Sequence, residues 1–418
     1  MHTVGIVAEY NPFHSGHAYQ ISRTREQLGG DTAVVAVMSG NWVQQADCAV
    51  ADKWLRARLA LMGGVDLVLE LPTMWAASTA ESFARGATDI LEATGVVTHL
   101  SFGSECGDAD KLQRVAACLD SSAYQQALAK YLEEGKTFAA CRQGAVEELL
   151  GKELADLLSK PNNNLGVEYI RALNALKSSI QPVTVRREGA AHNSVVGVLV
   201  RKEDGSYTSG PASMDLPRFV SATQIRMNLM DDQWGQAEPY LVPGGRALLE
   251  GNLIGLPALE RVQRAMLARV RTMTAEDWNR LPDSGAGEGL PLRLEQAGRK
   301  CTSMEEFFQL AKTKRYTHAR LRRLVLWAYL GLAESDRPER PPYLRVLGFN
   351  DKGQALLKEM KQKGRLPILT KPAHARELDE EGRRLFELEA RCTDLYDLCF
   401  DQVPVPGREW TQGPVIMR

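Results

Sequence analysis

Short apolar runs alternate with segments of helical spacing along the first half of the chain. The apolar runs are rich in valine, leucine and isoleucine, and they cover residues 4–10, 32–40, 65–72, 97–105 and 181–189. Apolar residues recur at helical spacing between them, in residues 16–28, 52–64 and 78–95. Such alternation predicts an α/β fold with a doubly wound parallel sheet that is covered by helices on both faces. We expect the ligand of such a sheet at the carboxyl ends of its strands.

The pattern changes after about residue 240. Residues 256–335 show mainly helical periodicity, and the stretch 334–343 is charged and rich in proline, which is typical of a connection. A strand, a helix, a strand and a long helix are predicted after it, at residues 343–349, 352–364, 366–370 and 376–399. We therefore expect an α/β catalytic domain over 1–240, a mainly helical domain over 241–335, and a small C-terminal α/β element over 336–418.

The composition is that of an ordinary globular protein. The chain has 418 residues, of which 44% are hydrophobic and 25% charged, and a net charge of −1, so any nucleic-acid site must be a local basic region. Seven cysteines occur without a Cys-x-x-Cys pair, which argues against structural zinc and a disulfide framework. Since neither a signal peptide nor a long apolar span is evident, we expect a cytoplasmic protein without a membrane partner.

The stretch "EYNPFHSGH" follows the first predicted strand and opens the first predicted helix. Free backbone N–H groups and the helix dipole make such a junction a good anion site. His14 and His17 could donate hydrogen bonds to a nucleotide phosphate as negative charge develops during attack on it. Capping of the helix, or a bond to a loop carbonyl, is the alternative role for these two histidines.

A second helix start, in "SATQIRMNL", carries two hydroxyl groups and a guanidinium. Ser221 and Thr223 suit the cap and first turn, and Arg226 lies on the turns that follow. Together they could bind phosphate, with the arginine able to donate two parallel hydrogen bonds. An ordinary capped amphipathic helix is the alternative for this stretch taken alone.

The two motifs in this order resemble those of the nucleotidylyltransferase superfamily. Further stretches resemble, in order and over nearly the whole chain, the bacterial tRNA(Met) cytidine acetate ligase family: "VMSGNWVQ", "DKWLRARLAL", "GVDLVLELP", "FGSE", "PNNNLGVEYI", "KTKRYTHARLRR", "YLRVLGFNDKG" and "LPILTK". The resemblance implies a ligase that forms acetyl-adenylate from ATP and acetate. It would then acetylate N4 of the wobble cytidine in the anticodon of elongator tRNA(Met), releasing AMP and diphosphate and forming a carbon–nitrogen bond.

The resemblance also implies site residues. His14 and His17 would be catalytic. The ATP-binding residues would be Val7, Ala8, Glu9, Tyr10, Asn11, Pro12, Phe13, His14, Ser15, Gly16, His17, Ala18, Tyr19, Gln20, Gly103, Asn162, Arg187, Ser221, Thr223 and Arg226. Mg²⁺ is expected with ATP, while its ligands are not identified, and no DNA partner is expected.

One stretch departs from the family pattern. The family typically reads Val-Gln-Arg-Gly-Glu-Pro-Ala where this chain has Gln45 and Ala46 in place of the arginine and glycine. The departure leaves open a weaker activity or an altered acyl donor. Compensation by Arg56 or Arg58 from the next helix is the other possibility.

The segment "KTKRYTHARLRR" contains six cationic residues and no acidic one. We expect tRNA binding by Lys312, Lys314, Arg315, Arg320 and Arg322. Helical spacing would place Lys312, Arg315, Ala319 and Arg322 on one face, and the rings of Tyr316 and His318 could stack on unpaired anticodon bases. A solvated charged face is the alternative.

Two other functions stay open from the sequence. An adenylyltransferase acting on a small metabolite is one, although the extra helical region argues against it. A catalytically weakened RNA-binding paralogue is the other, against which the intact histidine motif argues. Trp42, Trp54 and Trp75 are expected in the core, and stacking on adenine or on a flipped cytidine is the alternative for them. Cys48 receives no catalytic role. Lys53 is expected to pair either with a ligand phosphate or with Asp52.

Overall fold

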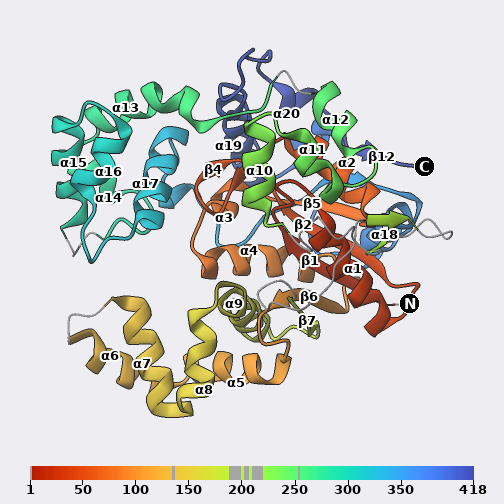
Figure 1. The fold of residues 1–418 in the computed structure, drawn as a ribbon, viewed down its shortest axis with the longest axis horizontal. Coiled ribbons are helices and arrows are strands. Elements are labelled where there is room, and N and C mark those ends of the chain that lie inside the picture. The colour runs from red at the N-terminus through yellow and green to blue at the C-terminus, as the bar shows by residue number, and fades with distance from the viewer. Residues whose placement is uncertain are drawn as a thin grey trace.

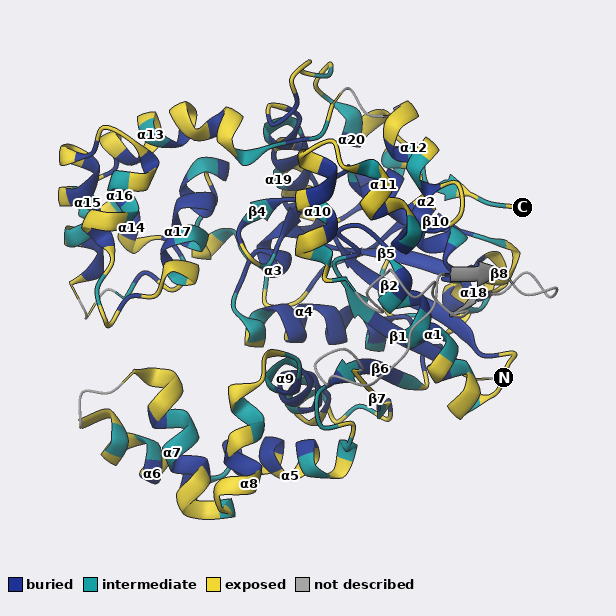
Figure 2. Ribbon diagram, viewed as in Figure 1, coloured by how far each residue is buried: buried dark blue, intermediate teal, exposed yellow. Residues whose placement is uncertain are grey.

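The computed structural model describes residues 2–133, 137–187, 199–201, 207–209, 220–252, 255–285, 287 and 289–418. One large sheet lies at the centre, with helices packed against it and further groups of helices extending to the side (Figure 1). The strands of this sheet are mostly buried, whereas many of the surrounding helices expose one face (Figure 2). The predicted α/β fold is confirmed.

Among the described residues the central sheet has eight strands in the order β11-β10-β5-β2-β1-β6-β7, with β12 paired to β10. They are β1 (Thr3–Ala8), β2 (Ala33–Ser39), β5 (Leu67–Leu71), β6 (His99–Ser104), β7 (Gln181–Arg186), β10 (Leu344–Phe349), β11 (Ile368–Leu369) and β12 (Val415–Ile416). The neighbours from β5 to β7 run parallel, as predicted, whereas β10 is antiparallel to β5. Glu188 and Gly189, predicted to end the fifth strand, lie outside the described residues.

Helices cover both faces of this sheet. Those that follow or precede its strands are α1 (Ser15–Leu28), α2 (Lys53–Met62), α3 (Thr73–Ala76), α4 (Ala80–Ala93), α9 (Pro161–Leu176), α18 (Asp351–Lys363) and α19 (Glu380–Asp397). Val34 and Ala36 of β2 belong to one hydrophobic cluster with residues of α1 and α2, and Val35 and Val37 belong to another with residues of α4 and α9. Successive side chains of a strand point to opposite faces, which explains why β2 is apolar from Ala33 to Met38.

The order of the strands defines where a ligand should bind. The chain moves from β1 outward through β2 to β5, and then crosses to the other side of β1 to form β6 and β7. The strand order therefore reverses between β1 and β6, and α/β sheets bind ligands outside the carboxyl ends of the strands at this point.

Two groups of helices extend from the sheet. Residues between β6 and β7, for which periodicity gave no assignment, form α5 (Ala109–Leu119), α6 (Ser122–Glu133), α7 (Phe138–Leu150) and α8 (Lys152–Ala155), ahead of α9. The predicted helical region contains α13 (Gln263–Thr272), α14 (Ala275–Asn279), α15 (Leu290–Lys300), α16 (Met304–Ala311) and α17 (His318–Leu330). In Figure 1 these two groups lie on the left, above and below one another.

The structure also contains shorter elements. They are the hairpin of β3 (Trp42–Val43) and β4 (Asp47–Cys48), the pair β8 (Leu199–Arg201) and β9 (Tyr207–Ser209), α10 (Ala222–Met230), α11 (Trp234–Ala237), α12 (Gly245–Asn252) and α20 (Arg408–Thr411).

The C-terminal segment has the predicted α/β character, but it is built into the central sheet. Strand β10 pairs with β5, and a buried ionic cluster joins the same regions. Lys53 Nζ lies 2.7 Å from Glu70 Oε1 and 2.6 Å from Glu409 Oε2, and Arg345 Nη2 lies 3.3 Å from Glu409 Oε1. The boundaries predicted for three domains stay a prediction.

Candidate active site

The loop after β1 places two histidines at the start of α1. His14 caps the helix: its Nδ1 accepts a hydrogen bond from the Gly16 N–H at 3.0 Å, and His17 Nδ1 accepts one from the His14 N–H at 3.2 Å. Because both Nδ1 atoms accept, each neutral ring carries its proton on Nε2. Both residues are partly exposed. The capping role and the phosphate role are thus compatible, since capping uses only Nδ1.

The protein keeps these histidines uncharged. Burial lowers the pKa of His14 to about 3, with contributions from the positive charges of Arg187 and Arg226. Burial, together with His14 and Arg187, holds the pKa of His17 well below its ordinary value. At neutral pH the loop therefore presents two neutral N–H donors, a form suited to stabilising negative charge that develops on a ligand.

A second polar group forms where β6, α9 and β7 meet. Glu105 Oε1 accepts from Asn162 Nδ2 at 2.7 Å, and its Oε2 accepts from the Asn163 N–H at 2.7 Å. Arg187 Nη1 donates to Asn162 Oδ1 at 3.2 Å. A Cβ on Gly103 would come within 3.2 Å of Arg187 Cγ, so a larger residue would crowd this side chain. The stretches "FGSE" and "PNNNLG" therefore meet Arg187 in space at the end of β6.

Helix α10 brings the second phosphate motif to the histidine loop. Ser221 caps it by accepting from the Gln224 N–H at 3.1 Å. Arg226 Nη1 donates to the Asn11 carbonyl at 2.9 Å, and its Nη2 donates to Thr223 Oγ1 at 3.1 Å. The two motifs, about 200 residues apart in the chain, thus form one region beside the carboxyl end of β1.

The predicted ATP-binding run does not present all its side chains. Those of Tyr10, Asn11, Pro12, Phe13, Ser15 and Ala18 are buried, whereas Val7, Ala8, Glu9, His14, Gly16, His17, Tyr19 and Gln20 are partly exposed. Gly103, Asn162 and Arg226 are also partly exposed, and Arg187 is exposed. Buried members of the run could meet a nucleotide only through their backbone. ATP contact by these residues stays a prediction.

The hairpin β3–β4 contains the departure from the family pattern. Ala46 has φ of 58°, a conformation that favours glycine, which explains why the family's glycine suits this position. Arg56 cannot replace the missing cation, because its buried guanidinium donates to the backbone carbonyls of Glu9, Ser39, Gly40 and Ala51. Arg58 is exposed on α2.

Several smaller expectations are resolved. Trp42, Trp54 and Trp75 are at most 4% exposed and belong to the core, as expected. Lys53 contacts Glu70 and Glu409, so the expected pairing with Asp52 is wrong. Asp52 instead caps α2 and pairs with Arg408 at 2.5 Å.

The basic segment differs from the helix predicted for it. Helix α17 begins at His318, after its cap Thr317, so Lys312 and Arg315 lie in a loop and share no helical face with Arg322. Tyr316 is 6% exposed and cannot offer its ring to a base, whereas His318 is exposed. The predicted stacking by Tyr316 is therefore wrong, because the loop turns this ring into the core.

Two arginines of the segment contact neighbouring loops. Arg320 Nε donates to the Asp283 carbonyl at 2.7 Å, and Arg322 Nη2 lies 3.4 Å from Asp47 Oδ2 of the hairpin β3–β4. Arg293, which the sequence gave no reason to select, donates to the carbonyls of Leu310 and Ala311 beside Lys312. Its position could not be inferred from periodicity, because it lies on a different helix.

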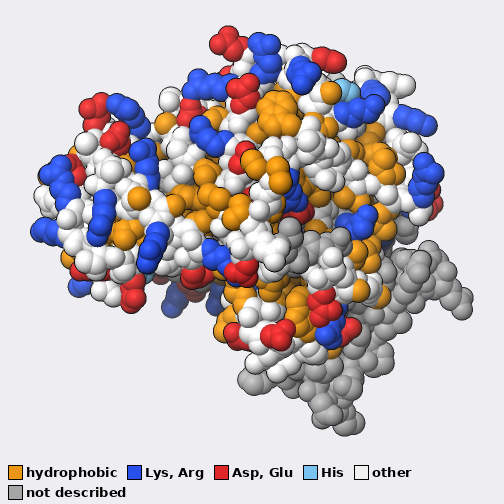
Figure 3. All heavy atoms as spheres, turned by 90° about the horizontal axis from the view of Figure 1, so that it is seen from above, with side chains coloured by type: hydrophobic (Ala, Val, Ile, Leu, Met, Phe, Trp, Pro, Cys, Tyr) orange, Lys and Arg blue, Asp and Glu red, His pale blue; other side chains and the backbone are white. Residues whose placement is uncertain are grey.

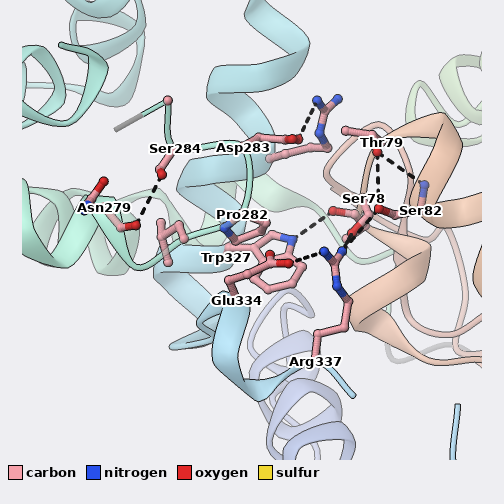
Figure 4. A pocket seen from close by; sticks show the side chains of 14 residues that line it. Ser78, Thr79, Ser82, Asn279, Pro282, Asp283, Ser284, Trp327, Glu334 and Arg337 are labelled. Atoms are coloured by element: carbon pink, nitrogen blue, oxygen red, sulfur yellow. Dashed lines mark hydrogen bonds and ion pairs between the residues drawn. The ribbon is translucent and has the colours of Figure 1, made fainter. Parts of the chain in front are cut away.

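A cavity of about 380 Å³ opens elsewhere, between the start of α4 and the helical region (Figure 4). Its arginines are paired within it, Arg323 with Asp283 and Arg337 with Glu334. None of the predicted site residues lines this cavity. It is therefore separate from the histidine loop.

Two kinds of feature are absent from the described residues. They contain no group of three or more His, Cys, Asp or Glu side chains placed to hold a metal ion. They also contain no helix that is long and apolar enough to cross a membrane.

Comparisons with known proteins agree with this geometry. A family model described as HIGH nucleotidyl transferase matches residues 1–408. The chain is 34% identical to the tRNA(Met) cytidine acetate ligase of Thermoanaerobacter sp. (strain X514), with 98% of each chain covered. It is 37% identical to the protein of that name from Caldanaerobacter subterraneus subsp. tengcongensis, with 96% of each covered.

Two similar solved structures are of Thermotoga maritima TmcAL, and the match covers the whole of both chains. The structure bound with alpha-thio ATP has a TM-score of 0.88 and 32% sequence identity. The apo structure has a TM-score of 0.89 and 33% identity.

Proposed function

The chain belongs to the tRNA(Met) cytidine acetate ligase family of HIGH nucleotidyl transferases, and we propose that it catalyses the ligation that this name describes. In the proposed reaction, acetate attacks the α-phosphate of ATP to form acetyl-adenylate and diphosphate. The acetyl group then passes to N4 of the wobble cytidine of elongator tRNA(Met), and AMP is released. The observation that carries this proposal is the meeting of both phosphate motifs at the strand-order reversal, in a chain that matches these relatives from end to end.

The histidine loop supports the first step. Attack of acetate puts negative charge on the non-bridging oxygens of the α-phosphate, and His14 and His17 would stabilise it through their Nε2–H groups. Their neutral state fits this role, because the ring keeps the proton that it donates in the hydrogen bond. The Nδ1 bonds fix both rings before the substrate arrives.

Two guanidiniums whose charges act on His14 would bind the phosphates of ATP beside this loop. Arg226 is held by Asn11 and Thr223, and Arg187 by Asn162. Each keeps part of its N–H capacity outside these bonds, since a guanidinium has five donors.

We propose that Mg²⁺ reaches the site with the phosphates of ATP. The described residues form no three-ligand cluster, and Mg²⁺ commonly binds through substrate phosphates with one or two carboxylates. Excess EDTA should then abolish activity, and Mg²⁺ should restore it.

The proposed tRNA site lies on the helical region. Residues 256–332 contain 14 Lys and Arg against 8 Asp and Glu, in a chain whose net charge is −1. Figure 3 shows Lys and Arg side chains spread over the end of the molecule that these helices form. Lys312, Lys314 and Arg315 are exposed in the loop before α17, and Arg322 reaches the hairpin β3–β4 of the sheet domain. Such a surface would bind the phosphate backbone, while the anticodon reaches the sheet domain.

The test separates the two half-reactions. Exchange of radiolabelled diphosphate into ATP should require acetate, and labelled acetate should then enter elongator tRNA(Met) transcribed with an unmodified wobble cytidine. Replacing this cytidine with uridine is the matched control, and it should abolish incorporation without affecting exchange. Exchange with another carboxylic acid instead would point to an altered acyl donor. The absence of exchange with any acid would favour the RNA-binding paralogue, and AMP retained on a small metabolite would favour the alternative adenylyltransferase.

A further inference from the structure

Acetylation of an amine releases one proton for each amide formed. The N4 group of cytidine is a weak nucleophile, since its lone pair is shared with the ring, so a group that removes this proton during attack would accelerate transfer. Such a base needs an oxygen or nitrogen that no other donor occupies, at the carboxyl end of β1 where the acetyl-adenylate would form.

Most polar groups of the site cannot fill this role. Nδ1 of both His14 and His17 already accepts a backbone N–H, and Nε2 carries the proton. Both carboxylate oxygens of Glu105 accept hydrogen bonds at the start of α9. Asp47 Oδ1 accepts from the Cys48 N–H at 2.9 Å, and its Oδ2 faces Arg322.

Glu9 is the exception. It follows the last residue of β1, directly before Tyr10, whose φ of 44° marks a strained turn. Its side-chain Oε1 accepts from the Gln44 N–H at 2.9 Å, and Arg56 Nη1 donates to the backbone carbonyl of Glu9 at 2.5 Å. Its Oε2 has no hydrogen-bond partner among the described residues, and the side chain is partly exposed. The carboxylate is thus fixed through one oxygen and open at the other.

We propose, on the basis of the acetyl transfer proposed above, that Glu9 is the general base that deprotonates the attacking N4 amine of cytidine. The N4 lone pair forms a bond to the carbonyl carbon of acetyl-adenylate. The bond from this carbon to the phosphate oxygen breaks, and its electron pair leaves with AMP. One N4 proton passes to Glu9 Oε2 and from there to water, so that the amide keeps the other proton.

The surroundings of Glu9 suit a base. Burial raises the pKa of Glu9, and the negative charge of Asp47 acts in the same direction, whereas the Gln44 hydrogen bond, Arg226 and Arg56 oppose it. The negative charge of Glu9 also acts on Tyr169 of α9, where it adds to the larger effect of burial in raising the pKa of the phenol. A carboxylate with a raised pKa accepts a proton more readily than an ordinary one. It is ionised, and so able to act as a base, at pH values above that raised pKa.

The variant Glu9→Gln tests the role while preserving size and the Gln44 bond. The readout is the ratio of single-turnover acetyl transfer to acetate-dependent diphosphate exchange, measured in the full-length enzyme with saturating tRNA. We expect this ratio to fall about 10²–10⁴-fold, as for loss of a general base. Transfer by the wild type should also fall tenfold for each pH unit below the pKa of Glu9, whereas transfer by Glu9→Gln should not show this acidic limb.

Two further variants test whether the acidic limb of the pH profile comes from Glu9. Glu9→Asp should retain the acidic limb at a reduced rate, and Asp47→Asn should move the limb to lower pH by removing a charge that raises the pKa of Glu9. A wild-type ratio with the acidic limb intact in Glu9→Gln would overturn the role of Glu9. Failure of the wild type to show acetate-dependent exchange would instead overturn the proposed function, so the two failures are distinguishable.

Discussion

Glu389→Gln should remove the pH dependence of stability that the buried carboxyl group of Glu389 confers. Glu389 of α19 is 4% exposed and accepts from the Thr73 N–H at 2.7 Å and from the Thr73 hydroxyl at 2.8 Å. Burial, with the negative charge of Glu70, raises the pKa of Glu389 to about 8. The folded protein therefore holds this carboxyl protonated near neutral pH. Glutamine reproduces the size and neutrality of that form.

The direction and size of this pH dependence follow from the difference in proton binding between the folded and the unfolded state. The ordinary pKa of 4.5 describes the unfolded chain, so between pH 4.5 and about 8 the folded state binds one more proton than the unfolded state. Stability from this group is complete below pH 4.5 and is lost as the pH rises through about 8, at about 1.4 kcal/mol per pH unit. Between pH 5 and 8 the variant should gain about 4 kcal/mol relative to the wild type.

Urea unfolding at pH 5, 6, 7 and 8 measures this difference directly. The matched control is Glu387→Gln, which removes an exposed carboxylate from the same helix and should give a curve parallel to that of the wild type. Parallel curves for the wild type and Glu389→Gln across this range would refute the reasoning, since they would mean that Glu389 has the same proton affinity in both states.

Three further predictions concern the proposed reaction. His14→Ala should slow acetate-dependent diphosphate exchange by about 10²–10³-fold, the usual cost of one donor to a developing negative charge, and an unchanged exchange rate would contradict this role. Arg226→Ala should lower kcat/KM for ATP by about 10–100-fold, corresponding to loss of a charged hydrogen bond, with KM raised as well; a normal KM would separate Arg226 from ground-state binding. Replacing Lys312 and Lys314 with alanine should weaken tRNA binding and make the slope of log affinity against log salt shallower by about 0.7–0.9 for each phosphate contact removed, while sparing exchange. Lys361→Ala, an exposed lysine on α18, should leave both affinity and slope unchanged, and equal behaviour of the two sets would leave the tRNA site unlocated.

Local patterns in the sequence predicted the parallel part of the sheet because buried parallel strands and their crossover helices have distinct periodicities. They could not predict that β10 pairs antiparallel with β5, since the register of Val346 opposite Leu69 depends on contacts far apart in the chain. Lys53 illustrates the same limit. A cation at a helix start indicated a negative partner, but the identity of Glu409 as that partner is a property of the folded sheet.

Some residues of the candidate site could likewise be predicted from the sequence, and others could not. His14 and His17 could be found from their spacing after a strand, because the strand-to-helix turn alone fixes where they lie. The side chain of Tyr316 could not be placed from the sequence, because a ring in a loop can face either solvent or the core. In the structure it is buried, since burial removes the apolar surface of the ring from water. Glu9 lay inside a recognised motif, yet its distinguishing feature is that Gln44 occupies one carboxylate oxygen and leaves the other open. That asymmetry arises only when the hairpin β3–β4 folds over the end of β1, so a test of Glu9 examines a role that the three-dimensional arrangement creates.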